Sequence, residues 1–272
     1  MRVLYHRVLL DEEAFLRRFH QERPGVTTAA LARGRVAGGG SSYDLVARAI
    51  PVGGRVVDLG CGDGFLLARL IERGHRAADL VGIDLSADEL RAARARAPEV
   101  AGLHARAQAL PLAGRSCAAV VSHLAFTLMP GLDAIAHELL RVLAAGGRFV
   151  ALVGGGPRGD DAFAGFLDLA LPHVQAAPPT PRLGDRRART DDGLATVLAG
   201  FASLAVDDVT IDVSGTADEV WGSLSTGYEL ATLAPAARAA LHAAFLAEAP
   251  RWRRADGLIA ATMYGRLVTA IR

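Results

Sequence analysis

The stretch Val56-Val57-Asp58-Leu59-Gly60-Cys61-Gly62-Asp63-Gly64 decides the fold of this chain. Its apolar, β-branched start indicates a buried strand, and the alternating glycines that follow indicate a tight turn. The amphipathic residues 65–73 predict a helix after the turn. Because glycine has no Cβ, such a turn can adopt positive φ and let the backbone approach a ligand closely. We therefore expect a cofactor to bind at this turn.

The glycine pattern differs from the dinucleotide-binding fingerprint G-x-G-x-x-G, which would require glycine at Phe65 or at Leu67. The run instead resembles the first motif, D-x-G-x-G-x-G, of class I (Rossmann-like) S-adenosylmethionine (SAM) dependent methyltransferases of the small-molecule type. The matching residues are Asp58, Gly60, Gly62 and Gly64. The resemblance implies that SAM contacts Asp58, Gly60, Cys61 and Gly62.

A second motif lies about 20 residues further on, the spacing that a strand-helix-strand unit imposes. The family has an acidic residue at the end of the second strand, where it holds the ribose hydroxyls. Residues 81–86, Val-Gly-Ile-Asp-Leu-Ser, supply Asp84 at this position, with Leu85 next to it, so the resemblance implies that both contact the cofactor. Ser86 and Glu89 then fit the S-x-x-E pattern of a capping box, which predicts the start of the next helix.

A third segment, residues 105–112, is similar to the family's G-D-A-x-x-L-P adenine-binding segment but has Arg106 at the usual acidic position. The resemblance therefore leaves the backbone amide of Ala107 or the side-chain amide of Gln108 to contact adenine. Residues 141–150 resemble the family's R-V-L-x-P-G-G-x-F segment. Together the similarity covers roughly residues 51–154.

Strand and helix patterns alternate through the centre of the chain, which predicts right-handed crossovers and a parallel sheet. We expect an α/β fold, a Rossmann-like, seven-stranded, mostly parallel sheet with helices on both faces and, as the resemblance implies, an antiparallel last strand. Residues 1–50 are expected to form an N-terminal helical cover, with a mobile glycine-rich segment at 34–42. Residues 51–272 are expected to form the SAM-binding domain, with helical cap insertions at about 155–200 and 217–252.

His123 is the best-placed candidate for catalysis, because it directly follows the fourth strand at the sheet edge where open α/β folds bind ligands. It is either a general base, with an unperturbed pKa near ~6.5, or a residue that stacks or hydrogen-bonds near the cofactor. Tyr43 is either a lid contact to the cofactor or an ordinary packed aromatic. His20 is interpreted as structural. The expected acceptor contacts are Phe126, Met129, Trp221, Tyr228 and Tyr264.

Composition excludes several classes of function. The net charge of +1 gives no general attraction to nucleic acid. No apolar stretch approaches the ~20 residues of a membrane span and the N-terminus is not a secretory signal, so we expect a cytoplasmic protein. All 30 Lys and Arg residues are arginine, which excludes a Walker A lysine and a pyridoxal Schiff base. Two cysteines are too few for a disulfide framework, and we expect no metal. Nothing indicates the oligomeric state.

The leading hypothesis is a SAM-dependent methyltransferase that methylates an oxygen, nitrogen or carbon of a small-molecule acceptor, for example in secondary metabolism, and releases S-adenosylhomocysteine (SAH). The alternative is a SAM-binding protein that does not transfer methyl, but uses SAM for another reaction or as a regulatory ligand. Methylation of DNA is disfavoured, because residues 122–125, Ser-His-Leu-Ala, lack the motif that holds a flipped base. A nucleotide-dependent oxidoreductase is disfavoured by the missing third glycine of the fingerprint.

Overall fold

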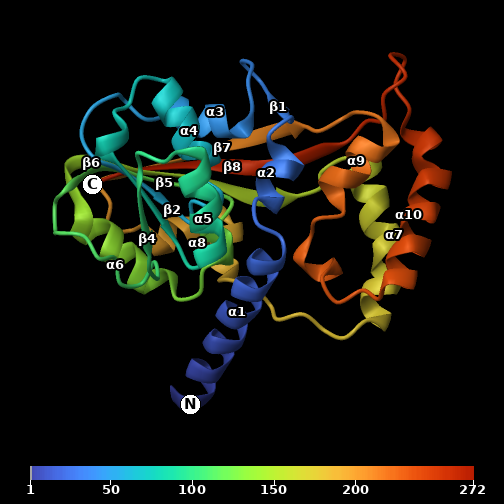
Figure 1. Ribbon diagram of the computed structural model, residues 1–272, viewed down its shortest axis with the longest axis horizontal. Coiled ribbons are helices and arrows are strands. Elements are labelled where there is room, and N and C mark those ends of the chain that lie inside the picture. The colour runs from blue at the N-terminus through green and yellow to red at the C-terminus, as the bar shows by residue number, and fades with distance from the viewer. Residues whose placement is uncertain (1) are drawn as a thin grey trace.

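A single eight-stranded sheet forms the centre of the protein (Figure 1). The structure is a computed structural model that describes residues 2–272, with side chains described from Glu12 onward. The strands are β1 (Arg35–Val36), β2 (Val56–Leu59), β3 (Leu80–Asp84), β4 (Ala101–His104), β5 (Cys117–His123), β6 (Leu143–Gly156), β7 (Ser203–Asp212) and β8 (Thr262–Ile271). Their order across the sheet is β1-β7-β8-β6-β5-β2-β3-β4.

The seven-stranded α/β core that the sequence predicts is confirmed. Strands β4, β3, β2, β5 and β6 pair in parallel, and the last strand, β8, runs antiparallel to both β6 and β7. The eighth strand, β1, is a correction to the prediction of a wholly mobile segment at 34–42. Val36 pairs with Ile211 of β7 and is buried, so the first residues of that segment are held on the sheet.

The parallel register brings three motifs to one edge of the sheet. Leu59 lies opposite Ile83, and Asp58 lies opposite Val121, so β2, β3 and β5 all end at the same level. Because parallel strands point their carboxyl ends in one direction, the glycine turn, Asp84 and His123 meet at this edge. The hydroxyl of Ser122 donates to the carbonyl of Leu59 across 2.8 Å and ties two of these strand ends together.

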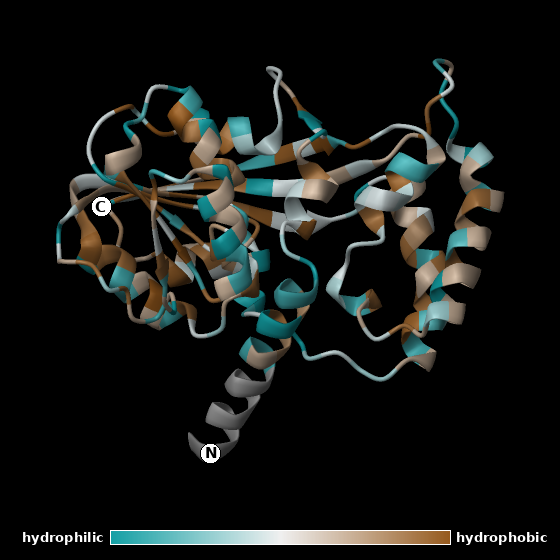
Figure 2. Ribbon diagram, in the orientation of Figure 1, coloured by the Kyte–Doolittle hydropathy of each residue, from teal (hydrophilic) through white to brown (hydrophobic). Residues whose placement is uncertain are grey.

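Helices cover both faces of the sheet. They are α1 (Arg2–Glu22), α2 (Val26–Leu31), α3 (Ser42–Arg48), α4 (Phe65–Glu72), α5 (Ala87–Arg96), α6 (Leu132–Val142), α7 (Ala162–Ala176), α8 (Asp191–Val197), α9 (Ala217–Leu224) and α10 (Pro235–Glu248). Helices α3 and α4 share one hydrophobic core cluster, whereas α6 and α8 belong to the cluster on the other face. Figure 2 shows hydrophobic residues concentrated in the central strands, between these layers.

Helices α7, α9 and α10 pack together at the opposite end of the molecule from α6 (Figure 1). Phe166 of α7 lies edge-on to Trp221 of α9 and to Phe245 of α10, with ring centroids 5.8 and 6.1 Å apart. These helices come from the two segments that the sequence marks as insertions. The short α8 and α2 were not predicted. None of the described helices is long and apolar enough to cross a membrane.

Candidate functional site

Two adjoining cavities lie at the carboxyl edge of β2, β3 and β5. The main cavity, about 230 Å³, is lined by the glycine turn, by strand ends including His123, and by residues of α1 and α2. The side cavity, about 110 Å³, is lined by the ends of β2 and β3, by the loops after β4 and β5 and by α1. Residues that line both cavities are His20, Gly60, Asp84, Ala125 and Leu128. The two cavities together therefore form one elongated site.

The glycines of the turn have different roles. Gly60, Gly62 and Gly64 all have positive φ, at 74°, 50° and 75°. A Cβ on Gly60 would lie 2.4 Å from the Cβ of Ala125, so this glycine lets the turn pack on the loop after β5. A Cβ on Gly62 would meet only the Oε2 atom of Glu89, at 3.9 Å. Gly62 therefore presents bare backbone to the main cavity, where a ligand can approach it.

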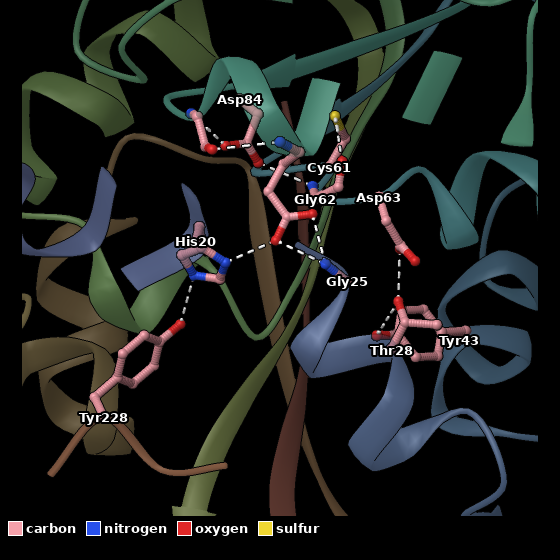
Figure 3. A network of polar contacts seen from close by, with 11 residues as sticks. His20, Gly25, Thr28, Tyr43, Cys61, Gly62, Asp63, Asp84 and Tyr228 are labelled. Atoms are coloured by element: carbon pink, nitrogen blue, oxygen red, sulfur yellow. Dashed lines mark hydrogen bonds and ion pairs between the residues drawn. The ribbon is translucent and has the colours of Figure 1, made fainter. Parts of the chain in front are cut away.

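Asp84 holds the glycine turn in place (Figure 3). Its Oδ2 atom accepts from the backbone N–H of Gly62 at 2.9 Å, and its Oδ1 atom accepts from the backbone N–H of Ser86 at 2.8 Å. Burial raises the pKa of this carboxyl, and the two N–H groups oppose that rise because they favour the charged form. A carboxylate here can accept hydrogen bonds from paired hydroxyls of a ligand.

Asp58 is a buried carboxylate that lacks a protein partner. Its side chain lines the main cavity, only 1 % of the residue is exposed, and neither carboxylate oxygen has a hydrogen bond among the described residues. Burial, together with the charges of Asp84 and Asp63, raises its pKa well above the usual range. A cation bound beside it would remove this penalty, because an opposite charge favours the ionised carboxyl. The orphaned oxygens therefore suit a positively charged ligand group.

The side cavity gathers most of the residues predicted for the adenosine end. Leu85, Ala107 and Gln108 line it, and so does Met129, which the sequence predicted as an acceptor contact. The Gln108 side chain donates from Nε2 to the carbonyl of Pro130 at 2.6 Å, so its amide is already engaged. Cys61 lines the main cavity instead, and burial raises the pKa of its thiol well above the usual range.

Arg106 lines the side cavity and has a partner that the sequence did not indicate. Its Nε and Nη2 atoms donate to Glu13 Oε1 of α1 at 2.9 and 2.5 Å. The Glu13 side chain is only 7 % exposed. A charge-assisted bond of this kind between α1 and the loop after β4 closes one side of the cavity.

Residues 12–31 of α1 and α2, here called the lid, are fastened to the strand ends by polar contacts (Figure 3). The Glu89 carboxylate accepts from the backbone N–H of Gly25 at 2.9 Å and lies 2.7 Å from Nδ1 of His20. His20 Nε2 lies 3.0 Å from the hydroxyl of Tyr228. Thr28 donates to Asp63 at 2.7 Å. The lid therefore covers the main cavity through bonds to residues far away in the sequence.

Glu89 corrects the predicted capping box. The Ser86 side chain does accept from the backbone N–H of Glu89 at 3.3 Å, as a helix cap requires. The reciprocal bond is absent, because the Ser86 N–H donates to Asp84 and the Glu89 side chain reaches the lid instead. His20, interpreted as structural from the sequence, lines both cavities. No spacing signal in the sequence links it to Glu89, 69 residues away.

His123 lines the main cavity, but its ring is enclosed. Nε2 lies 2.9 Å from the hydroxyl of Ser42, and the ring stacks on Tyr43 with centroids 3.7 Å apart. Nδ1 is buried without a partner among the described residues. Burial lowers the pKa of His123 to about 3, which corrects the expected value near 6.5. An imidazole so reluctant to take up a proton is a poor general base, so the geometry favours a stacking and positioning role.

We expect His123→Gln to leave the pH dependence of turnover unchanged between about pH 5 and 8, where a catalytic imidazole would titrate. The parent should also lose stability as pH falls from about 6.5 toward 3, because only the unfolded state then takes up the proton. The free energy of unfolding should fall by about 1.4 kcal/mol for each pH unit in this range. Urea unfolding at several pH values measures this loss, which His123→Gln should remove. If the turnover of the parent rises near pH 6.5 and the variant lacks this rise, then His123 acts as a general base after all.

Some of the predicted acceptor contacts line the two cavities, and the others do not. Tyr228 lines the main cavity, whereas Met129 lines the side cavity. Phe126 is fully buried and packs on Phe149 of β6, so it belongs to the core. Trp221 packs among α7, α9 and α10, and Tyr264 lies beside the guanidinium of Arg158, so neither lines the two cavities. Met263, one residue before Tyr264, does line the main cavity and was missed.

Part of the chain that includes the glycine turn is similar to known proteins. A family model described as a methyltransferase domain matches residues 56–147. A trans-aconitate 2-methyltransferase of Azoarcus sp. (strain BH72) is 39% identical over 113 residues, which are 39% of this chain and 42% of that protein. An uncharacterized methyltransferase of Mycobacterium tuberculosis (strain ATCC 25618 / H37Rv) is 39% identical over 94 residues, 35% of this chain and 37% of the relative. The chain thus spans about two fifths of the length of these relatives.

Solved structures share the fold over 85% of this chain at low sequence identity. A putative methyltransferase from Bacillus halodurans C-125 superposes with a TM-score of 0.54 at 14% identity, covering 85% of this chain and 98% of its own. The YcgJ protein of Bacillus subtilis gives a TM-score of 0.55 at 17% identity, covering 85% and 97%. These likenesses speak for the fold alone. The family match and the glycine turn identify residues 56–147 as a methyltransferase domain, which lies on a Rossmann-like fold.

Proposed function

We propose that this protein binds SAM across the two cavities and transfers its methyl group to a small-molecule acceptor. The observation that carries the proposal is the orphaned carboxylate of Asp58, which lines the same cavity as Asp84 and the open backbone of Gly62. SAM carries a cationic ammonium group, a sulfonium and a ribose with two hydroxyls. The donors and acceptors of the site fit these groups, so the fit rests on the chemistry of the residues present.

Each part of the site has a role in this proposal. Asp84 would accept from the ribose hydroxyls, and Asp58 would pair with the ammonium group. The side cavity, with Leu85, Ala107 and Met129, would take the adenine. SAM supplies an activated methyl group when it is bound. The chain itself would orient the acceptor and exclude water under the lid, which is the larger part of what such a displacement requires.

The main cavity also supports a small acceptor. It holds about 230 Å³, and residues of α1 and α2 close over it, so a polymer chain has no room there. We propose on this basis that the protein does not act on nucleic acid. We also propose that it works in the cytoplasm, where SAM is made, and note that both cysteines are free. The helices α7, α9 and α10 and residues 1–50 are proposed as coverings of a SAM-binding domain that begins at residue 51.

The test is a comparison of ligands followed by an acceptor screen. We expect SAM and SAH to bind at least ~10²-fold more tightly than NAD or ATP, a difference of ~2.7 kcal/mol, in isothermal titration calorimetry. The physical reason is that Asp84 suits two ribose hydroxyls and that the glycine turn lacks a cradle for a pyrophosphate. Binding of NAD without binding of SAM would refute the proposal.

Release of SAH separates methyl transfer from the alternative of a SAM-binding protein that does not transfer methyl. The screen includes trans-aconitate, which the name of the Azoarcus relative gives as a substrate, together with phenols, alcohols and amines. SAH formed in step with a methylated product supports transfer. Tight SAM binding without SAH formation on any acceptor class would favour the alternative.

A further inference from the structure

The exposed surface of the main cavity is mainly apolar, and part of it is aliphatic. Uncharged lining residues come from α2, from the loop after β5, from the loop after α9 and from β8. The uncharged side chains that line the cavity in these segments include Val26, Leu31, Leu124, Leu128, Thr226 and Met263. The hydroxyl of Thr226 already donates to the carbonyl of Ser223 at 3.1 Å. This part of the cavity therefore offers an apolar surface with few free polar groups.

The charged groups of the main cavity are all acidic. The carboxylates are Asp58, Asp63, Asp84 and Glu89, and no arginine is found among the described residues that line this cavity. The whole chain contains no lysine. An acceptor that carries a carboxylate or phosphate would therefore find no counter-charge here.

Three of the four carboxylates are already compensated. Asp63 accepts from Thr28 and from Nη2 of Arg96, the latter at 2.5 Å. Asp84 accepts two backbone N–H groups, and Glu89 accepts the N–H of Gly25 and contacts His20. These partners satisfy the carboxylates without help from a ligand, so they create no demand for a cationic acceptor.

The fourth carboxylate, Asp58, is matched by the proposed cofactor. Its free oxygens would pair with the ammonium group of SAM, so this carboxylate makes no demand on the acceptor once the cofactor is bound. His20 offers nothing to an anion either, because Nδ1 contacts Glu89 and Nε2 contacts Tyr228. Two arginines, Arg17 and Arg106, line the side cavity, and Arg106 is bound to Glu13. Burying an unpaired charge beside these groups is costly.

We propose that the acceptor is an uncharged, largely apolar small molecule, so that this enzyme discriminates against polycarboxylate and phosphorylated acceptors. The inference rests on the proposed function, because the charge of Asp58 is balanced only when SAM or SAH is bound. In the transfer itself, the methyl group leaves sulfur for the acceptor atom while the S–C electron pair stays on sulfur. A hydroxyl acceptor loses its proton to solvent.

The protein provides its own reporters for a binding test. The chain has three methionines, of which Met263 lines the main cavity and Met129 lines the side cavity. In a protein labelled with ¹³C-methyl methionine, SAH binding should shift the Met129 resonance. The SAH-loaded protein is then titrated with benzamide, benzoate and benzamidinium, which have nearly the same shape but carry charges of zero, minus one and plus one. The Met263 resonance reports which of them enters.

We expect benzamide to bind at least ~10-fold more tightly than benzoate, a difference of ~1.4 kcal/mol, and no less tightly than benzamidinium. Thr226→Arg, which places a cation at the cavity, should bring benzoate to within a few-fold of benzamide. The matched control Thr226→Gln has a similar length without the charge and should keep the parent's ranking. The parent ranking alone tests the inference if Thr226→Arg fails to fold.

Two failures are distinguishable. If SAH does not shift Met129 and shows no heat of binding, then the proposed function falls and the inference falls with it. If SAH binds but benzoate or benzamidinium binds ~10-fold more tightly than benzamide, then only the inference on acceptor charge is wrong. Equal binding of the three probes, or binding of none of them at Met263, would also overturn it, because charge would then not select the acceptor.

Discussion

Gly62→Val should abolish binding of SAM and SAH while the protein stays folded. The backbone of Gly62 faces the main cavity, and a Cβ there would meet only Glu89 Oε2, at 3.9 Å, so valine has space in the free protein. The side chain would then occupy the place of the cofactor. We expect affinity to fall by more than ~10²-fold, or at least ~2.7 kcal/mol, as measured by calorimetry.

The strain of the substitution needs its own control. Gly62 has a φ of 50°, which valine adopts at a cost of roughly 1–2 kcal/mol. Gly146 also has positive φ, 70°, with no atom within 4 Å of an added Cβ, and it lines neither cavity. Gly146→Val should therefore lose similar stability in urea unfolding and keep normal affinity. Normal SAH binding by Gly62→Val would show that the cofactor does not approach this turn.

Asp84→Ala should weaken SAH binding by ~10- to 150-fold, or ~1.5 to 3 kcal/mol, the range typical of hydrogen bonds to a charged group. The substitution removes the proposed acceptor for the ribose hydroxyls. It also frees the N–H groups of Gly62 and Ser86, which Asp84 holds at 2.9 and 2.8 Å, and so loosens the turn. Asp84→Asn keeps one acceptor oxygen and should lose less affinity than Asp84→Ala.

Asp161 provides the matched control. Its carboxylate accepts the backbone N–H of Phe163 at 2.9 Å at the start of α7, and it lines neither cavity. Asp161→Ala should therefore lower the free energy of unfolding by about 1 kcal/mol, as loss of a helix cap does, with unchanged SAH affinity. If both variants bind SAH equally well, then Asp84 does not hold the cofactor.

The sheet was predictable because its signals are local. The β-branched run before Gly60 and the alternation of strands with helices depend on neighbouring residues, and they gave the correct core and the antiparallel last strand. Strand β1 escaped prediction because two residues carry too little pattern. Its position depends on a partner strand about 175 residues later, through the pairing of Val36 with Ile211. Helix α8, only seven residues long, was missed for a similar reason.

For the site, too, residues in local motifs were predicted and long-range contacts were not. Asp58, Gly62 and Asp84 sit in motifs with fixed spacing, and the structure brings them to one cavity. Phe126 and Trp221 were predicted as aromatic residues near the expected cavity. Burial of a large aromatic side chain in a core is strongly stabilising, and both residues pack in the core instead. The contacts of the lid could not be read from the sequence, since they join residues with no shared periodicity. The pKa of His123 depends on its burial, which no spacing reveals.

The hydrogen bond from the Gly25 amide to Glu89 allows the opening of the lid to be followed by hydrogen exchange. This amide hydrogen is held by a carboxylate 64 positions later in the chain, so it exchanges with deuterium only when residues 12–31 swing away. Where the free amide exchanges faster than the lid recloses, its exchange rate equals the rate of lid opening. Because the cofactor is expected to lie beneath the lid, that rate also sets an upper limit on how often SAH can escape. Mass spectrometry of a single peptide spanning Gly25 would thus give a lower limit on the residence time of the product without any knowledge of the acceptor.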